Sequence, residues 1–293
     1  MLHISDRVLD DWLSEDLPYL DLTSWALDID TQAARFEVYA RAPTVVCGAS
    51  VAARIFKKLE ATPEFAATDG KLVAKDELIF SGSGNASALH AAWKLVVNVL
   101  EYASGVATRT KTLVDAAHAI NPDVAIVSTR KSFPGTRALS VQAVLAGGGS
   151  PHRLGLSETV LVFDRHRAFF TEDPKILPQT LVAKLRKKVP EKKLLAEVGT
   201  SDEARLWAQA GIDGIQFDKF DPAILTSTVR ELRVDYPDVL LIGTGGIDPT
   251  NIASYASSGV NVLSTSTVYH GKPADLAVKL FPVSAGTSLT QKS

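Results

Sequence analysis

The stretch STRKSFPGTRALSVQAVLAGGGSPHR at residues 128–153 lies between two short apolar runs. The runs, at 124–127 and 159–163, have the length and composition of buried strands, and residues 140–147 between them have a helical pattern. A strand, a helix and a second strand in this order form the repeating unit of a parallel sheet. This stretch therefore predicts an α/β fold.

Cationic side chains stand near both ends of this stretch. Arg130 and Lys131 directly follow the first predicted strand. His152 and Arg153 follow a triple glycine and precede the second strand. Taken alone, a histidine–arginine pair in a loop is ordinarily a solvated surface feature. Guanidinium groups suit carboxylates and phosphates, however, and α/β barrels bind ligands at strand carboxyl ends, so the two clusters together predict an anion pocket.

The rest of the chain alternates between apolar and amphipathic segments. Strands are expected at residues 124–127, 159–163, 194–198, 213–217, 239–242 and 261–264. Helices are expected between or after them at 140–147, 178–188, 201–210, 221–233 and 249–258. This alternation predicts a parallel sheet with helices packed on it. About six strands are too few for the closed eight-stranded barrel, so the expected fold is an incomplete, open α/β barrel.

The residues before this alternation have a different pattern. Residues 34–42 alternate as a half-buried strand does, and residues 50–59 form an expected helix. Residues 86–121 have a helical pattern, with a break expected at Gly105 because glycine weakens a helix interior. We therefore expect an N-terminal α+β sandwich domain, the barrel, and a disordered tail of small polar residues. Their expected ranges are 1–110, 111–282 and 283–293.

The composition argues against several classes of protein. At 293 residues and 46% hydrophobic content, the chain can form one large or two moderate cores. Lys94 and Asn98 interrupt the most apolar helical segment, and the first residues lack an apolar signal core, so no membrane protein is expected. A net charge of -2 provides no basic field for nucleic acid. The single cysteine, Cys47, is expected in the core of a cytoplasmic protein.

Two acidic residues are expected at the same edge of the sheet as the cations. Glu197 stands among apolar residues of the third strand, an unusual place for a carboxylate without a partner. Asp218 ends the fourth strand. Each has an ordinary alternative, because Glu197 could pair with a lysine and Asp218 could cap the following helix. Two acids together with two cationic clusters favour a functional site.

Two further loops have the composition of phosphate sites. The fifth strand ends in Thr244, Gly245 and Gly246, and the sixth ends in hydroxyl residues that include Thr265 and Ser266. Glycines let a phosphate approach the backbone, and unpaired N–H groups attract anions. Either loop alone would more often be an ordinary turn. With the acids and cations, they fit a sugar-phosphate donor whose leaving group is held by Mg²⁺.

Several ordered motifs resemble those of the quinolinate phosphoribosyltransferase family, also called nicotinate-nucleotide pyrophosphorylases, over nearly the whole chain. They are EDLPYLDLTS at 15–24, SGVATRT at 104–110, TRKSFPG at 129–135, GGGSPHRLGL at 147–156, Glu197, FD at 217–218 and TGGI at 244–247. The phrases YASGVATRT and PHRLGLSETVLVF look like those of the ModD branch, whose members are associated by name with molybdenum uptake.

The resemblance implies both an architecture and an activity. The family has an N-terminal α+β domain, an open α/β barrel, and a homodimer in which the N-terminal region of one subunit completes the partner's site. It transfers phosphoribose from phosphoribosyl pyrophosphate to a pyridine dicarboxylate, with Mg²⁺ and decarboxylation.

The resemblance also implies roles for individual residues. Those expected to contact the acceptor acid or the donor are Arg130, Lys131, His152 and Arg153. Those expected to act on the ribose and to bind Mg²⁺ are Glu197 and Asp218, which with Lys131 form the expected catalytic set. Those expected to bind phosphate are Thr244, Gly245, Gly246, Thr265 and Ser266.

The chain departs from the family mainly on the acceptor side. Lys94 stands where the family has an arginine, and Phe163 stands where it has a lysine. Ile242 replaces an acidic residue, and Ser266 replaces the later glycine of the phosphate loop. Lys219 is the last residue of a motif that reads LDN in the family. Charged hydrogen bonds contribute about 1.5–3 kcal/mol each, so losing one and weakening another is expected to weaken the binding of a dicarboxylate about a hundredfold or more. The expected acceptor is a small aromatic or heterocyclic acid other than quinolinate. Lys94, Phe163 and Lys219 are counted among the residues that bind it.

Two other functions stay open. One is a genuine quinolinate enzyme in which Lys219 replaces the missing lysine, although strand alternation argues that Asp218 and Lys219 point to opposite faces. The other is a non-catalytic anion-binding protein linked to molybdate handling, which would have no need of Glu197 and Asp218. Neither nucleic acid nor a membrane is an expected partner.

Overall fold

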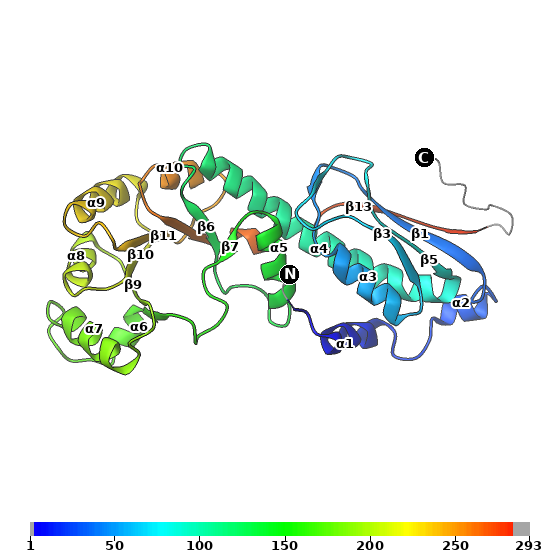
Figure 1. Cartoon of the computed structure of the whole chain (residues 1–293), viewed down its shortest axis with the longest axis horizontal. Coiled ribbons are helices and arrows are strands. Elements are labelled where there is room, and N and C mark those ends of the chain that lie inside the picture. The colour runs from blue at the N-terminus through cyan, green and yellow to red at the C-terminus, as the bar shows by residue number, and fades with distance from the viewer. Residues whose placement is uncertain (1–2, 284–293) are drawn as a thin grey trace. The chain divides into compact units, whose positions relative to one another are not determined.

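The computed structural model describes residues 3–283, and the chain forms two compact units (Figure 1). Among the described residues, the first unit contains 3–109, 133–148 and 271–283. The second contains Thr110–Ser132 and Gly149–His270. Two segments from the range expected to form the barrel therefore belong to the first unit. The tail expected at 283–293 lies outside the described residues, apart from Val283.

The first unit is built on an antiparallel sheet with the strand order β13-β1-β5-β3. These strands are β1 (Ala33–Ala40), β3 (Thr62–Ala66), β5 (Leu78–Asn85) and β13 (Leu276–Pro282), and the short strands β2 (Thr44–Val45) and β4 (Leu72–Val73) pair separately. The alternation expected at 34–42 is present, because Phe36 and Val38 are fully buried. β13 pairs along β1 from Ala34 to Ala40. Residues 276–282 thus join this sheet instead of the barrel.

Helices of the first unit supply the other half of its core. They are α1 (Asp6–Asp16), α2 (Leu22–Ala26), α3 (Ala49–Lys58), α5 (Arg137–Ala146) and most of α4 (Ala86–His118). Phe56 of α3 packs against Phe36 and Phe80 of the sheet, with ring centroids 5.4 and 4.9 Å away. A sheet covered on one face by helices is the expected α+β sandwich.

The long helix α4 is continuous, so the break expected at Gly105 was wrong. A Cβ atom on Gly105 would lie 2.9 Å from the backbone nitrogen of Ala274 and 3.0 Å from Cα of Pro273. The neighbouring Ser104 hydroxyl accepts a hydrogen bond from the Cys47 N–H at 3.0 Å. Glycine is present here because another segment approaches the helix closely, and that contact outweighs its low helix propensity.

The second unit contains a parallel sheet with the strand order β7-β6-β12-β11-β10-β9-β8. Its strands are β6 (Ala125–Ser128), β7 (Ser150–Pro151), β8 (Val160–Val162), β9 (Leu194–Val198), β10 (Gly214–Asp218), β11 (Leu240–Thr244) and β12 (Val262–Thr265). The six expected strands are all present, and β7 is an additional two-residue strand. Because β7 and β8 stand at opposite ends of the order, the sheet is open, and the expected incomplete barrel is confirmed.

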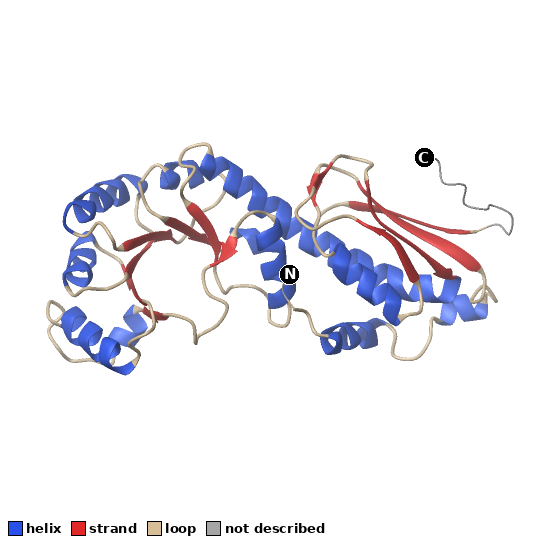
Figure 2. Ribbon diagram, in the orientation of Figure 1, coloured by secondary structure: helices blue, strands red, loops and turns tan. Residues whose placement is uncertain are grey.

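The sheet curls, and helices lie on its outer face (Figure 2). They are α6 (Asp164–Arg167), α7 (Leu177–Lys188), α8 (Ser201–Gln209), α9 (Pro222–Asp235) and α10 (Ile252–Ala256). The 3-10 turn η1 (Thr267–Tyr269) follows β12, and the Tyr269 hydroxyl donates to Ser128 Oγ at the end of β6. Leu161, Leu195 and Ile242 form a buried apolar cluster, with Phe163 and Val262 packed against it. Among the described residues, no helix is both long and apolar enough to span a membrane.

Candidate active site

The two carboxylates predicted from the sequence lie on neighbouring strands. Glu197 of β9 is the register partner of Gln216 on β10, and the Gln216 amide donates a 2.7 Å hydrogen bond to Glu197 Oε2. Asp218 lies two residues further along β10, so it faces the same side of the sheet as Gln216. Glu197 does not pair with a lysine, because its hydrogen-bond partner is the Gln216 amide. Asp218 does not cap the following helix, because Asp221 is the N-cap of α9.

Burial raises the pKa of Glu197 above the ordinary value. The Gln216 hydrogen bond opposes this shift, whereas the negative charge of Asp218 adds to it. Arg167 and Arg165 lower the pKa of Glu197. The two carboxylates are therefore close enough to repel each other, and a cation placed between them would relieve that repulsion.

A cationic cluster, consisting of Arg130, His152 and Arg153, lies where β6 and β7 end. Burial lowers the pKa of Arg153, and the positive charge of Arg130 lowers it further. Burial also lowers the pKa of His152, as does the charge of Arg153, while the nearby Gln216 amide raises it. Three of the four cationic residues expected in the anion pocket are therefore close enough to interact electrostatically.

Two nitrogen atoms of this cluster lack protein partners. The buried Arg130 Nε and His152 Nε2 have no hydrogen bond to any described residue. The buried Gln216 Oε1 is likewise unbonded, so Gln216 and His152 lie near each other without hydrogen-bond geometry. Leaving buried polar groups unpaired costs free energy, about 1–3 kcal/mol each. Arg130 and His152 thus present donors suited to an anionic oxygen. Lys131 is exposed beside them.

Phe163 forms an apolar wall beside the cationic cluster. The guanidinium carbon of Arg153 lies 6.0 Å from the Phe163 ring centroid, a cation–π contact. The same ring packs against the apolar cluster that contains Leu195 and Ile242. Ile242 is the register partner of Gln216, so an apolar side chain adjoins the Gln216–Glu197 pair. The inner face of the sheet therefore combines anion-binding groups with an apolar surface.

The loop that follows β11, called here the glycine loop, consists of Gly245, Gly246 and Ile247. Gly245 and Gly246 have φ values of +86° and +72°, which favour glycine. A Cβ on Gly245 would lie 2.6 Å from Asp218 Oδ1, whereas one on Gly246 would meet nothing within 4 Å. Among residues 3–283, the N–H groups of the glycine loop have no hydrogen-bond partner. Successive unpaired N–H groups of this kind bind anions.

The threonine hydroxyls next to the glycine loop are engaged within the protein. Thr244 donates to the Ser264 carbonyl at 3.2 Å, and Thr265 donates to the Ile247 carbonyl at 2.7 Å. Thr265 Oγ1 also accepts from the Thr267 N–H. These hydroxyls hold the loop in place and are not presented to a ligand. Ser266 is half-buried, and its hydroxyl makes no hydrogen bond to the described part of the chain.

Lys219 follows β10 in a left-handed conformation, with φ of 57°. Its N–H donates to the Thr244 carbonyl at 2.8 Å. The expectation that it points away from Asp218 assumed a continuing strand, but β10 ends at Asp218. The Cβ position of Gly245 lies 2.6 Å from Lys219 Cγ, so the lysine stem lies against the glycine loop.

Lys94 differs from the other predicted site residues because it belongs to the first unit. It is exposed on α4, and its ammonium lies 5.2 Å from the ring centroid of Trp93. All other predicted site residues belong to the second unit.

Sequence reasoning missed Gln216 and the arginines of α6. Gln216 was detectable, since it is a polar residue within the apolar run GIQFD, two positions before Asp218. Arg167 pairs with Asp164 and, at 3.4 Å, with Glu203. No short motif in the sequence indicates that Arg167 also lowers the pKa of Glu197.

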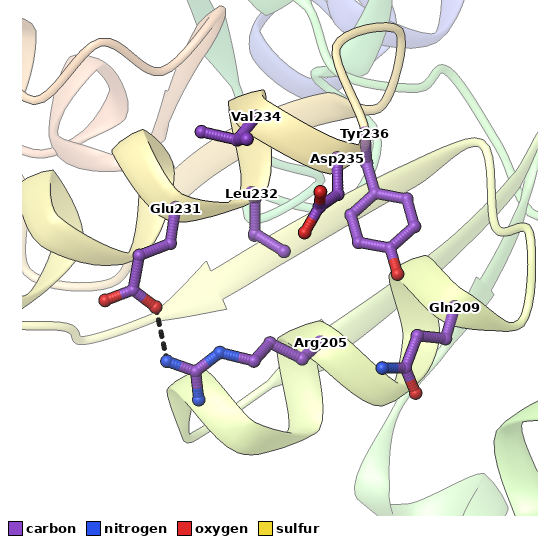
Figure 3. Close-up of a pocket in the computed structure, with 7 residues that line it drawn as sticks. All are labelled: Arg205, Gln209, Glu231, Leu232, Val234, Asp235 and Tyr236. Carbon is purple, nitrogen blue, oxygen red and sulfur yellow. Dashed lines mark hydrogen bonds and ion pairs between the residues drawn. The ribbon is translucent and has the colours of Figure 1, made fainter.

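A separate pocket of about 350 Å³ lies between α8 and α9 (Figure 3). Its lining residues are Arg205, Gln209, Glu231, Leu232, Val234, Asp235 and Tyr236. An ion pair between Arg205 and Glu231 crosses one side of it. The lining includes none of the residues at the carboxyl ends of the strands, so this pocket is distinct from the candidate active site.

The fold and this arrangement of residues define a phosphoribosyltransferase of the α/β-barrel class. Residues 106–279 match the family domain described as quinolinate phosphoribosyl transferase, C-terminal domain, and residues 21–104 match the N-terminal domain of the same family. The chain belongs to the quinolinate phosphoribosyltransferase family.

Known relatives agree with this assignment. The chain is 37% identical to the ModD protein of Pasteurella multocida over 278 residues, which are 95% of this chain and 98% of that protein. It is 38% identical to the ModD protein of Rhodobacter capsulatus over 259 residues, 88% of this chain and 98% of that protein. The expected similarity to the ModD branch is thus confirmed. The solved nicotinate-nucleotide pyrophosphorylase of Francisella tularensis has the same fold, with a TM-score of 0.86, 24% identity, and coverage of 95% of this chain and 98% of that chain.

Proposed function

We propose that this enzyme transfers phosphoribose from phosphoribosyl pyrophosphate to a small aromatic or heterocyclic acid other than quinolinate. The observation that carries the proposal is the apolar wall beside the cationic cluster. Phe163 contacts Arg153 and belongs to the same apolar cluster as Ile242. An acid bound there would have its anionic group on the cations and a ring face against Phe163. A second carboxylate directed at Phe163 or Ile242 would lose its hydration without gaining a charged partner.

In the proposed reaction, a nucleophilic atom of the acceptor forms a bond to the anomeric carbon of the donor. The bond from this carbon to the pyrophosphate oxygen breaks, and pyrophosphate leaves with the electron pair. Positive charge develops on the ribose as the bond breaks. Glu197 and Asp218 lie on adjacent strands and are suited to stabilise that charge. The glycine loop is suited to hold the 5′-phosphate through its unpaired N–H groups.

Mg²⁺ is the proposed cofactor, held by Glu197 and Asp218 together with the donor. Their mutual repulsion fits a shared divalent cation. Among the described residues, no group of three or more His, Cys, Asp and Glu side chains is arranged to hold a metal. Mg²⁺ commonly takes one or two carboxylates and completes its shell with phosphate oxygens and water. When bound, it would neutralise charge on the departing pyrophosphate.

We also propose that the enzyme is a homodimer in which Lys94 of one subunit serves the site of the other. The proposal rests on the family resemblance and on the position of Lys94, which is exposed on α4 of the first unit. A cation from a second chain would add to the cationic cluster and hold the acceptor acid.

The deciding experiment measures pyrophosphate release from phosphoribosyl pyrophosphate and Mg²⁺ with quinolinate and a panel of aromatic and heterocyclic acids. We expect release with one or more acids of the panel at a kcat/KM at least tenfold above that with quinolinate. Preferential use of quinolinate would identify a nicotinate-nucleotide pyrophosphorylase and refute the proposed acceptor class. Donor binding without turnover on any acid would instead favour an anion-binding protein.

A further inference from the structure

We infer that Lys219 binds the 5′-phosphate of the donor, together with the glycine loop. This inference rests on the proposed function, because it assigns a contact within the same site. From the sequence, Lys219 was expected among the residues that bind the acceptor, and in one alternative it replaced the family's missing lysine. The geometry points to the other substrate.

The backbone at Lys219 is held in an unfavourable conformation. Its φ of 57° lies in the left-handed region, which glycine and asparagine enter more readily than lysine. The N–H of Lys219 donates to the Thr244 carbonyl, so the turn itself would form equally well with glycine or asparagine. The left-handed backbone costs stability with lysine at this position. Its presence at the end of a strand of the site therefore indicates that the lysine side chain has a functional role.

The side chain of Lys219 lies against the glycine loop. A Cβ on Gly245 would be 2.6 Å from Lys219 Cγ and 2.9 Å from its backbone nitrogen, so only glycine permits this approach. The space next to Gly246 is open, because a Cβ on that residue would meet nothing within 4 Å. Lys219 is exposed, and no ion pair or hydrogen bond engages its ammonium among residues 3–283.

The glycine loop and Lys219 are chemically complementary. The loop presents unpaired N–H groups, which bind phosphate oxygens but carry no full charge. The nearest carboxylate to Gly245 is Asp218, which would repel a phosphate. The nearby Asp248 carboxylate is occupied by the N–H and hydroxyl of Thr250, at 2.7 and 2.6 Å. An ammonium at Lys219 would add a full positive charge to the neutral N–H donors of this loop and so strengthen its binding of a phosphate dianion.

The test compares three variants with the wild-type enzyme. Lys219→Asn removes the charge and keeps a residue that tolerates the left-handed conformation. Lys219→Arg keeps the charge, and Lys187→Asn removes a charge from an exposed site on α7. Calorimetry would measure the binding of phosphoribosyl pyrophosphate with Mg²⁺, of ribose 5-phosphate, and of inorganic pyrophosphate with Mg²⁺. Thermal unfolding without ligand would be measured in parallel.

We expect Lys219→Asn to bind phosphoribosyl pyrophosphate and ribose 5-phosphate about 10- to 100-fold more weakly, with pyrophosphate binding unchanged. Its unfolding temperature should equal or exceed that of the wild type, because the backbone strain is reduced. Lys219→Arg should retain most of the affinity, and Lys187→Asn all of it.

Three results would overturn the inference. Undiminished ribose 5-phosphate binding by Lys219→Asn would exclude a 5′-phosphate contact while leaving the proposed function intact. Weakened pyrophosphate binding alone would assign Lys219 to the leaving group. A wild-type enzyme that binds no phosphoribosyl pyrophosphate would refute the proposed function and, with it, the role of Lys219.

Discussion

The burial of Glu197 in the site disfavours its ionised form and so lowers the free energy of unfolding at neutral pH. Its pKa is raised by burial, so the folded state holds a proton more tightly than the unfolded state does. Stability therefore decreases as the pH rises from the ordinary glutamate pKa through the raised value. In the proposed mechanism Glu197 acts in its ionised form, so activity should fall as the pH drops and the carboxylate takes up a proton. Stability and activity thus change in opposite directions over one pH range.

The first prediction concerns Glu197→Gln. The amide keeps an oxygen for Gln216 but cannot ionise, so turnover should fall about a hundredfold or more. The free energy of unfolding near pH 7 should equal or exceed the wild-type value, with the difference shrinking toward pH 4. Denaturant unfolding across this pH range and pyrophosphate release would test both parts. Glu231→Gln, at the exposed pair with Arg205, serves as a control and should alter neither by much.

The second prediction concerns the acceptor pocket. Phe163→Lys introduces the cation that the wider family has at this position, so the KM for quinolinate should decrease about tenfold or more. The preferred acid should lose affinity, because its apolar contact is removed. Phe163→Leu keeps an apolar side chain and should not improve the use of quinolinate. Equal KM values for quinolinate in the wild type and Phe163→Lys would show that Phe163 does not determine the acceptor.

At the scale of elements, local patterns identified what local forces determine. The six main strands of the barrel are apolar runs rich in Val, Ile and Leu. They could be recognised in the sequence because strands buried on both faces consist mainly of apolar residues. The continuity of α4 and the pairing of β13 with β1 depend on contacts between distant segments. The left-handed turn at Lys219 was also missed, since lysine gives no sign of such a conformation.

A third prediction tests the contact on α4. Gly105→Ala should destabilise the enzyme by about 1–3 kcal/mol, because the new methyl group would overlap the backbone near Ala274. Helix propensity alone predicts the reverse, a gain of about 1 kcal/mol. Urea unfolding would decide between them. Gly155→Ala is the control, because a Cβ there would meet nothing within 4 Å, and it should have little effect.

At the scale of the whole molecule, the candidate site draws on one unit for most of its groups. The cations, the carboxylates and the glycine loop were predictable because they follow strands of a single parallel sheet. Lys94 belongs to the other unit, and no strand pattern in the sequence indicates which site it serves.

The fourth prediction tests the proposed shared site by mixing two inactive variants. Lys94→Ala and Glu197→Ala should each lack most activity alone. After subunit exchange in equal amounts, half the dimers should be mixed, and each mixed dimer should contain one intact site. About a quarter of the wild-type activity should therefore return. If Lys94 served its own subunit, no activity would return.

The order of strands in the sheet has a consequence for how such enzymes diverge. The residues assigned to the donor lie on or directly after β9, β10 and β11, whereas Arg130, His152, Arg153 and Phe163 follow β6, β7 and β8, at the two ends of the strand order. Exchanging Phe163 leaves the hydrogen-bonded register of Glu197 with Gln216 untouched. A duplicated gene can therefore acquire a new acceptor by a few substitutions at the outer strands of the sheet, while the inherited chemistry of bond cleavage persists on the strands between them.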